Sequence, residues 1–202
     1  MIQQKHFFIE KVNNNYFILR HGETEYTADA DSNIYPKSTR FELGITENGK
    51  NDIKKLIPNI KEKDIDLIFA SDFLRTKITS KIVADALDLN VVFDKRLRDV
   101  DLGIYAGKPK KTFYNAINYK KMLEEGPEEG ESWMICAYRV DDFMKDIEKR
   151  FNNKNILIVS HGDPLWLLEK MIAQKEDPYK IAEKRRMVPI IRPGELREIS
   201  FK

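Results

Sequence analysis

Two of the chain's three histidines occupy the same kind of position in the sequence. In "YFILRHGETEY", four apolar residues lead into Arg20 and His21, and in "ILIVSHGDP" an apolar run leads into His161; a glycine follows each histidine. A neutral imidazole is a fair nucleophile toward phosphorus, and an adjacent arginine is suited to holding phosphate oxygens. Glycine lets the backbone turn sharply and lets a ligand approach closely. The repeated pattern favours phosphoryl chemistry, although a single histidine of this kind is more often an ordinary loop residue.

Two further segments carry residues that suit the same chemistry. Arg75 stands one turn into a predicted helix in "SDFLRTKITS", where its side chain can reach back over a helix N-terminus that attracts anions. The loop "RLRDVDLG" carries Asp99 and Asp101, and a carboxyl group near a phosphate can act as a general acid. Taken alone, each segment also fits a solvated helix arginine or a surface aspartate.

Composition limits the kinds of partner. The chain has 202 residues, which predicts one domain over residues 1–202, and its 35 basic and 33 acidic residues leave a net charge of +2. This balance gives no general reason to expect nucleic acid or a membrane surface as a partner. Cys136 is the only cysteine, so an internal disulfide is impossible and a cytoplasmic location is expected. Oligomeric state stays open.

The sequence carries no spacing typical of a bound metal or nucleotide. It has no His-x-x-x-His pair, no Asp-x-Asp-x-Asp cluster and no Gly-x-x-x-x-Gly-Lys loop. We therefore expect no cofactor and no metal, and any anion must be held by side chains gathered locally.

Apolar periodicity predicts the elements that position these residues. Strands are expected at 16–20, 66–71, 91–93 and 155–160, with a hairpin partner at 6–12 and edge strands at 187–192 and 196–201. Helices are expected from Glu47 to Ile57 between Thr46 as N-cap and Pro58, and at 71–89 with Ser71 or Asp72 as N-cap. Further helices are expected at 110–125, at 132–150 with Ser132 as N-cap, and from Asp163 to about 174.

Strands that alternate with helices predict an α/β fold, a three-layer αβα sandwich around a mostly parallel mixed sheet. Ligands of such sheets bind outside the carboxyl ends of the strands. His21, His161 and the Ser71-Asp72 pair each follow a predicted strand. We therefore expect three strand ends to converge on one crevice, with long loops at 22–44 and 96–110 beside it.

These residues resemble the signature of the histidine phosphatase superfamily, in its phosphoglycerate mutase-like branch. Arg-His-Gly-Glu-Thr begins the resemblance, and the other segments follow in the family's order between residues 16 and 172. They read "LGITENGKND", "ASDFLRTKITSKIVA", "RLRDVDLGIYAG", "GESWMICAYRV" and "ILIVSHGDP".

The resemblance implies a role for each matching residue. His21 would be the nucleophile that becomes phosphohistidine, and Asp99 would be the proton donor. Arg20, Arg75 and His161 would hold the phosphoryl oxygens, with His161 adding positive charge as a cation. The implied reaction has two steps, transfer of the phosphoryl group to His21 and hydrolysis by water that Asp99 activates, and it needs no metal.

Three departures from the family pattern bear on mechanism and specificity. The family usually has glutamate where this chain has Asp99, so Asp163 is the alternative donor. Tyr26 and Thr27 stand where Trp-Asn is usual. Residues 27–44 match poorly, although Lys37 and Arg40 there could supply charge.

Loop length bears on the type of reaction. Residues 104–129 form a cap or insertion segment that is shorter than in mutases of this family, so the pocket is expected to admit water. Water access favours a phosphatase that acts on a small phosphorylated metabolite. Two alternatives stay open: phosphoglycerate mutase-type transfer, and a phosphate-binding protein without turnover.

Overall fold

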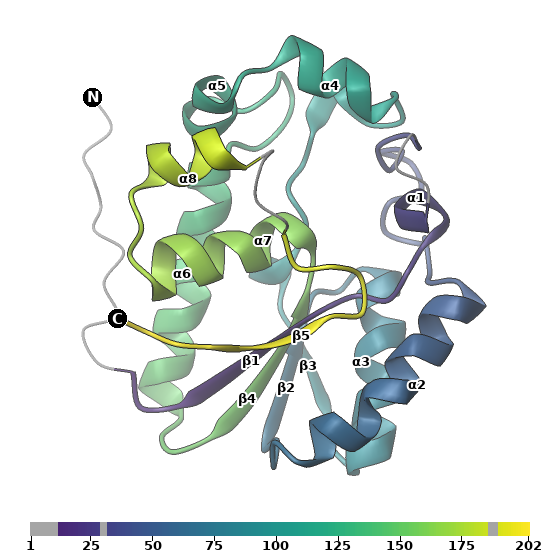
Figure 1. The fold of residues 1–202 in the computed structure, drawn as a ribbon, viewed down its shortest axis with the longest axis vertical. Coiled ribbons are helices and arrows are strands. Elements are labelled where there is room, and N and C mark those ends of the chain that lie inside the picture. Colours follow the sequence, from purple (N-terminus) through teal and green to yellow (C-terminus); the bar gives the residue numbers. More distant parts are fainter. Residues whose placement is uncertain (1–11, 29–31, 186–189) are drawn as a thin grey trace.

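A computed structural model describes residues 12–28, 32–185 and 190–202 of the chain. Its sheet has five strands in the order β3-β2-β4-β1-β5 (Figure 1). The strands are β1 (Asn15–Arg20), β2 (Leu67–Ala70), β3 (Val91–Phe93), β4 (Asn155–Ser160) and β5 (Leu196–Ile199). The first four run parallel to their neighbours, and β5 pairs antiparallel with β1 at one edge. The mostly parallel mixed sheet expected from the sequence is confirmed.

Helices cover both faces of this sheet (Figure 1). The longer ones are α2 (Glu47–Lys61), α3 (Leu74–Leu87) and α6 (Trp133–Arg150), and α7 (Gly162–Leu167) forms a further long helical segment together with the π-helical η3 (Leu168–Ala173) that follows it. The shorter ones are α1 (Glu25–Ala28), α4 (Lys110–Ala116), α5 (Tyr119–Glu124), α8 (Pro178–Lys184) and the turns η1 (Lys95–Leu97) and η2 (Gly103–Tyr105). Helices α6 and α7 lie on one face, α2 and α3 on the other, and α4 and α5 lie above the carboxyl ends of the strands.

Alternation along β1 explains the two-sided core. Tyr16 and Ile18 belong to the apolar cluster shared with α6 and α7, whereas Phe17 and Leu19 belong to the cluster shared with α2 and α3. Successive side chains of a strand point to opposite faces, so an uninterrupted apolar run such as "YFIL" fits a strand buried on both sides. The sequence therefore encodes the position of β1 inside the sheet.

Helix ends follow the predicted caps at two places. Thr46 accepts a hydrogen bond from the Gly49 backbone N–H and begins α2, and Ser132 accepts one from the Ile135 backbone N–H and begins α6. The predicted end of the first helix at Pro58 is wrong, because α2 continues through the proline to Lys61. Ile60 in that last turn is fully buried, and its packing offsets the hydrogen bond that proline removes.

The predicted cap of α3 is also wrong. Phe73 is the N-cap residue, and its side chain makes no capping bond. Ser71 and Asp72 are engaged elsewhere: the Ser71 hydroxyl lies 2.9 Å from His161 Nε2, and the Asp72 carboxylate accepts two bonds of 2.6 Å from Arg98. Residues that look like caps in sequence serve here to hold the neighbouring loops.

The outcomes differ for one further predicted helix and three further predicted strands. The predicted helix at 110–125 is two short helices, because Ile117 leaves the helical region at the end of α4. The strand predicted at 6–12 falls almost entirely outside the described residues. Of the edge strand predicted at 187–192, residues 190–192 are described and do not form a strand. The edge strand predicted at 196–201 is confirmed as β5.

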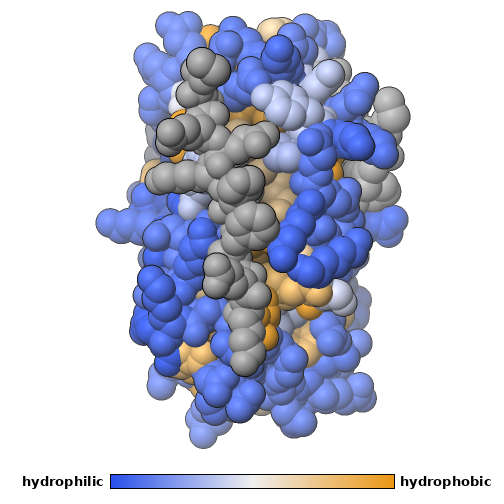
Figure 2. All heavy atoms as spheres, turned by 90° about the vertical axis from the view of Figure 1, so that its left-hand side faces the viewer, coloured by the Kyte–Doolittle hydropathy of each residue, from blue (hydrophilic) through white to orange (hydrophobic). Residues whose placement is uncertain are grey.

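The described surface is largely polar on the face drawn in Figure 2, where hydrophilic residues cover most of the area and hydrophobic ones show mainly between them. Within the described ranges, no helix is both long enough and apolar enough to cross a bilayer.

Candidate active site

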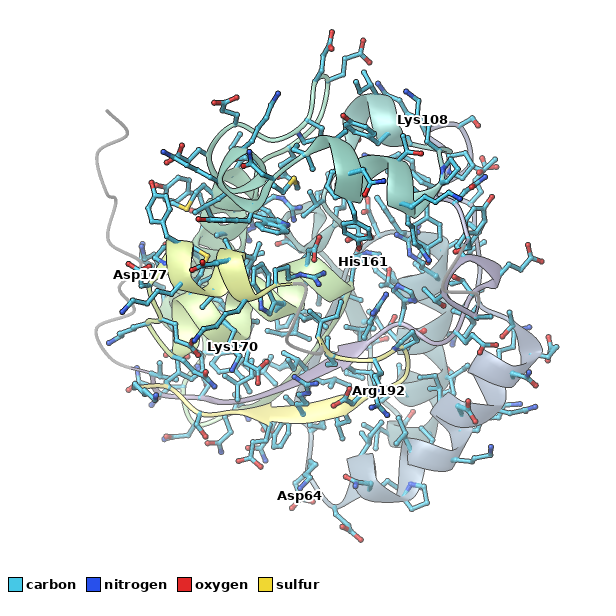
Figure 3. The ribbon with its side chains drawn as sticks, turned by 45° about the horizontal axis from the view of Figure 1, so that its top comes forward. Asp64, Lys108, His161, Lys170, Asp177 and Arg192 are labelled. Atoms are coloured by element: carbon cyan, nitrogen blue, oxygen red, sulfur yellow. The ribbon has the colours of Figure 1, made fainter. Side chains whose placement is uncertain are left out.

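Strand register brings the predicted residues together. In the parallel pairing of β1 with β4, Arg20 lies opposite Ser160, so His21 and His161 follow at the same level. The next strand, β2, ends beside β4, and the backbone N–H of Ser71 donates to the Val159 carbonyl oxygen. The two imidazole rings lie 5.3 Å apart between centroids. The predicted convergence of three strand ends is confirmed, and Figure 3 places His161 in the middle of the molecule, with Asp64 at its far edge.

One ring nitrogen of His21 has a partner that fixes its tautomer. Nδ1 lies 2.8 Å from the carbonyl oxygen of Gly22, which can only accept, so Nδ1 carries the proton and Nε2 keeps its lone pair. Burial, followed by the positive charges of Arg75 and Arg20, lowers the pKa of His21 well below its usual range. The imidazole is therefore neutral, as a nucleophile must be. The side chain of His21 is only 1% exposed.

Gly22 sets how closely His21 approaches the neighbouring helix. A Cβ at this position would lie 3.0 Å from the Gly49 carbonyl oxygen and 3.1 Å from the side chain of Ile45. The Gly22 backbone N–H donates to Thr79 Oγ1 at 3.0 Å. The glycine after the histidine is thus needed for packing of the loop against α2 and α3.

Two guanidinium groups, that of the buried Arg75 and that of the half-buried Arg20, lie close to the imidazoles. Arg75 is 1% exposed, donates from Nη1 to the Arg40 carbonyl oxygen at 2.8 Å, and lies 4.2 Å from the centroid of the Tyr35 ring. Arg20 donates from Nη1 to the Ile191 carbonyl oxygen at 3.1 Å. In both arginines the buried Nε–H has no acceptor among the described residues. Donors of this kind are suited to an anionic ligand.

Asp99 lies against this cluster. Its Oδ2 atom is 3.3 Å from Arg75 Nη2 and 3.8 Å from His161 Nδ1, and the backbone N–H of Val100 donates to Oδ1 at 3.1 Å. Burial raises the pKa of Asp99, and the charge of Arg75 partly offsets that rise. The neutral acid is therefore favoured relative to an ordinary aspartate, and a neutral carboxyl is the form that can donate a proton.

The loop that carries Asp99 is fixed from below by two side chains that sequence analysis did not single out for this purpose. Ser160 Oγ donates to the Leu97 carbonyl oxygen at 2.6 Å. Arg139 Nη1 donates to the Arg96 carbonyl oxygen at 2.6 Å, and its other nitrogens bind both carboxylate oxygens of Glu131. The arginine in the "GESWMICAYRV" segment is therefore a positioning residue, and only its place after Gly-Glu-Ser hinted at it.

Asp163 has a different environment. Its Oδ1 accepts from Nε of Arg185 at 3.2 Å and from Nη2 of the same guanidinium, while its Oδ2 accepts from Trp133 Nε1 at 3.3 Å. Both oxygens are thus occupied by protein donors, as expected for a carboxylate that holds structure together. Neither Arg185 nor Trp133 was predicted at the site, because nothing local in their segments links them to it.

His161 departs from the expected cation. Its Nε2 lies 2.9 Å from Ser71 Oγ, and its buried Nδ1 makes no hydrogen bond within the described part of the chain. Burial, followed by the charge of Arg75, lowers the pKa of His161 well below its usual range. Burial and the neighbouring guanidinium charges both disfavour the imidazolium form of His161.

Arg20, Arg75, Asp99 and Asp163 line a pocket of about 180 Å³, whereas the buried rings of His21 and His161 are not among its lining residues. Its described lining includes Arg20, Tyr26, Thr27, Tyr35, Arg40, Phe73, Arg75, Asp99, Lys110, Asp163 and Arg185. Of the two cations expected from residues 27–44, Arg40 reaches the pocket, whereas Lys37 is exposed and paired with Glu129. Tyr35, which stacks on Arg75, had no signal in the sequence. No group of three or more His, Cys, Asp or Glu side chains placed for a metal occurs in the described ranges.

A parallel α/β sheet that ends in paired histidines, buried arginines and a raised-pKa carboxyl defines a phosphate-handling enzyme class. The family model for the histidine phosphatase superfamily (branch 1) matches residues 16–178, and the chain belongs to this family. The predicted resemblance is confirmed.

The relatives that match this chain are named for different activities. The chain is 28% identical over 162 residues to a probable phosphoglycerate mutase GpmB from Enterobacter, which covers 77% of this chain and 73% of the relative. It is 25% identical over 154 residues to phosphoserine phosphatase 1 from Hydrogenobacter thermophilus, with 73% and 71% covered.

Solved structures share the fold. A mycobacterial glucosyl-3-phosphoglycerate phosphatase superposes with a TM-score of 0.76 at 18% identity over 91% of this chain and 88% of the other. A phosphoserine phosphatase from Entamoeba histolytica in complex with 3-phosphoglyceric acid gives 0.75 at 23% identity over 92% and 89%. The predicted three-layer αβα architecture is thereby confirmed.

Proposed function

We propose that the protein is a phosphatase that hydrolyses small phosphomonoesters through a phosphohistidine at His21. The observation that carries the proposal is the neutral His21 ring, whose Nδ1–H is held by the Gly22 carbonyl oxygen at 2.8 Å so that Nε2 keeps its lone pair. Arg20 and Arg75, with buried Nε–H groups that have no acceptor in the described residues, support the binding of a phosphoryl group beside that nitrogen.

The two steps need only residues of the candidate site. In the first, His21 Nε2 attacks phosphorus in line while neutral Asp99 protonates the leaving oxygen. In the second, the Asp99 carboxylate takes a proton from water, and the water oxygen displaces His21 from phosphorus. Arg20, Arg75 and His161 stabilise charge on the three equatorial oxygens, and positioned charge of this kind supplies much of the rate in phosphoryl transfer.

Access of water favours hydrolysis over mutase-type transfer. We propose that residues 104–129 act as the cap of a single domain over residues 1–202. In the structure they contain only the turn η2 and the two short helices α4 and α5 above the strand ends (Figure 1). A short cap leaves the phosphoenzyme open to water. The charge balance and the single buried Cys136 support a cytoplasmic protein whose partner is a small phosphorylated metabolite and not a nucleic acid.

Hydrolysis of p-nitrophenyl phosphate tests this function. We expect release of nitrophenol at the same rate with and without EDTA, and without any bisphosphoglycerate primer. Rapid acid-labile, base-stable labelling from a ³²P-phosphomonoester would identify the phosphohistidine. Turnover that requires the primer would instead support a mutase, and phosphate binding with no turnover would support a protein that only binds.

The pH dependence follows from the two shifted groups. His21 stays neutral well below pH 6.5 because its pKa is lowered, so an acidic limb from this residue should not appear near that value. The pKa of Asp99 is raised, so kcat/KM for an alkyl phosphate should fall as pH rises through it and the acid ionises. With p-nitrophenyl phosphate, whose leaving group needs little protonation, this alkaline limb should be much weaker. Equal limbs for both substrates would argue against Asp99 as the acid.

A further inference from the structure

A second and larger cavity adjoins the phosphate pocket. Its volume is about 510 Å³, within the range of about 300–1,000 Å³ that is typical of small-molecule sites. The two cavities share a boundary made of Leu102, Phe113, Tyr114, Asp163 and Arg185. A phosphomonoester whose phosphate group lies in the first pocket would therefore extend its alcohol part toward the second cavity.

The second cavity has an apolar and aromatic lining. Its walls come from α4, α5, the start of α6 and the end of α8. The apolar and aromatic members are Leu102, Phe113, Tyr114, Ile117, Tyr119 and Met122, with Trp133 and Ala182. Trp133 directs its only polar atom, Nε1, to Asp163, which leaves the rest of its ring as apolar surface. Such walls stabilise a ligand by removing apolar area from water.

Each cation along this path already has at least one acceptor, although the buried Nε–H of Arg40, in the first pocket, has none among the described residues. Arg40 is paired with Asp101 at 2.8 Å, Arg185 is paired with Asp163, and Lys110 donates to the Tyr26 carbonyl oxygen at 2.8 Å. Apart from Arg20 and Arg75, these are all the cations among the described residues that line either cavity. Among the described residues, a second anionic group that reached the second cavity would meet one lining cation, Arg185, and that cation is already paired with Asp163.

The charged side chains at the second cavity also favour an uncharged ligand. Glu183 is an exposed member of its lining, and Asp163 stands at the boundary of the two cavities. A substrate carboxylate there would meet acidic side chains and an arginine that is already engaged, whereas an uncharged ring would meet aromatic and aliphatic walls. Aromatic groups pack favourably against such side chains.

We propose that the second cavity binds the alcohol part of the substrate. The preferred substrate is then a phosphomonoester of an apolar alcohol about as large as a phenyl ring, with no carboxylate near the phosphate. This inference rests on the proposed phosphatase function and specifies its substrate class. It separates this chain from the phosphoserine phosphatases and the glucosyl-3-phosphoglycerate phosphatase that it resembles, which are named for anionic esters.

Esters of primary alcohols test the preference at nearly constant leaving-group chemistry. Rates would be compared for ethyl phosphate, 2-phenylethyl phosphate, O-phosphoserine and 3-phosphoglycerate. We expect kcat/KM for 2-phenylethyl phosphate to exceed that for ethyl phosphate and for both anionic esters by at least about tenfold. An equal or higher value for O-phosphoserine would overturn the inference.

Tyr119 offers a variant with a matched control. It lines only the second cavity and is 42% exposed, while Tyr179 on α8 is 45% exposed and lines neither cavity. We expect Tyr119→Ala to reduce the preference for the phenyl ester by about threefold to tenfold and to leave ethyl phosphate unchanged. Tyr119→Phe, which keeps the ring, and Tyr179→Ala should keep the preference. Loss of the preference in Tyr179→Ala as well would contradict the assignment.

Binding distinguishes this inference from the phosphatase proposal itself. Titration calorimetry would compare 3-phenylpropylphosphonate, which cannot be hydrolysed, with propylphosphonate, and tighter binding of the former by at least about tenfold is expected. If no ester is hydrolysed but this difference is found and Tyr119→Ala removes it, the cavity assignment holds and the phosphatase proposal fails. If esters are hydrolysed through phosphohistidine but the phenyl group gives no advantage in rate or binding, the cavity assignment fails alone.

Discussion

Replacing His21 by alanine is expected to lower kcat for p-nitrophenyl phosphate by about 10⁴-fold or more, which is the scale of losing a covalent nucleophile. The reason is geometric as well as chemical. Nε2 of His21 is a lone-pair nitrogen because Nδ1 donates to Gly22 at 2.8 Å, and the other imidazole nearby, His161, has its Nε2 engaged with Ser71 at 2.9 Å. The other unengaged ring nitrogen in the described site, His161 Nδ1, lies 3.8 Å from Asp99 Oδ2.

Steady-state rates and ³²P labelling would check this result together. We expect His21→Ala to lose the labelled phosphoenzyme, whereas His161→Ala should reduce turnover but still form some label. The unfolding midpoint and the affinity for inorganic phosphate serve as controls in His21→Ala, because Arg20 and Arg75 remain. Full activity in a folded His21→Ala protein would refute the phosphohistidine mechanism.

The second large effect concerns the proton donor. Asp99→Asn is expected to lower kcat/KM for an alkyl phosphate by about 10²- to 10⁴-fold, which is the usual contribution of general acid–base catalysis. The amide keeps the shape of the side chain and its place beside Arg75, but it cannot give up a proton to the leaving oxygen. With p-nitrophenyl phosphate the first step should be far less affected, so the ratio of the two losses measures acid catalysis directly.

Asp163→Asn is the matched comparison for the donor. Both oxygens of Asp163 accept bonds from Arg185 and Trp133, so we expect its replacement to change kcat/KM by only a few-fold and by the same factor for both substrates. Asp99→Glu, which restores the carboxyl group and the usual family residue, should recover most of the rate lost in Asp99→Asn. A larger and leaving-group-dependent loss in Asp163→Asn would assign the proton transfer to Asp163.

Much of the fold could be predicted because its signals are local. The run from Tyr16 to Leu19 is apolar at every position, as expected of a strand covered on both faces, and Thr46 and Ser132 cap helices through contacts only three residues away. The errors arose where a distant residue competes for a local group. Ser71 could not cap α3 because its hydroxyl lies against His161, which is 90 residues away along the chain.

The sequence by itself determined which side chains stand at the strand ends, since a strand followed by His-Gly fixes where that histidine leaves the sheet. His21 and His161 could be found in this way, Arg75 could be found from its place one turn into a helix, and the family resemblance implied a role for each. The resemblance also singled out Asp99, but with Asp163 as the alternative donor.

Only the tertiary structure shows how the surroundings of these two carboxyl groups differ. Asp99 meets Arg75 from 24 residues away, whereas Asp163 is taken up by Trp133 and Arg185 from 30 and 22 residues away. The state of a titratable group depends on burial and on the charges around it, and both arise when distant segments pack. For the same reason, neither the tautomer of His21 nor the apolar cavity beside the pocket could be predicted from the sequence.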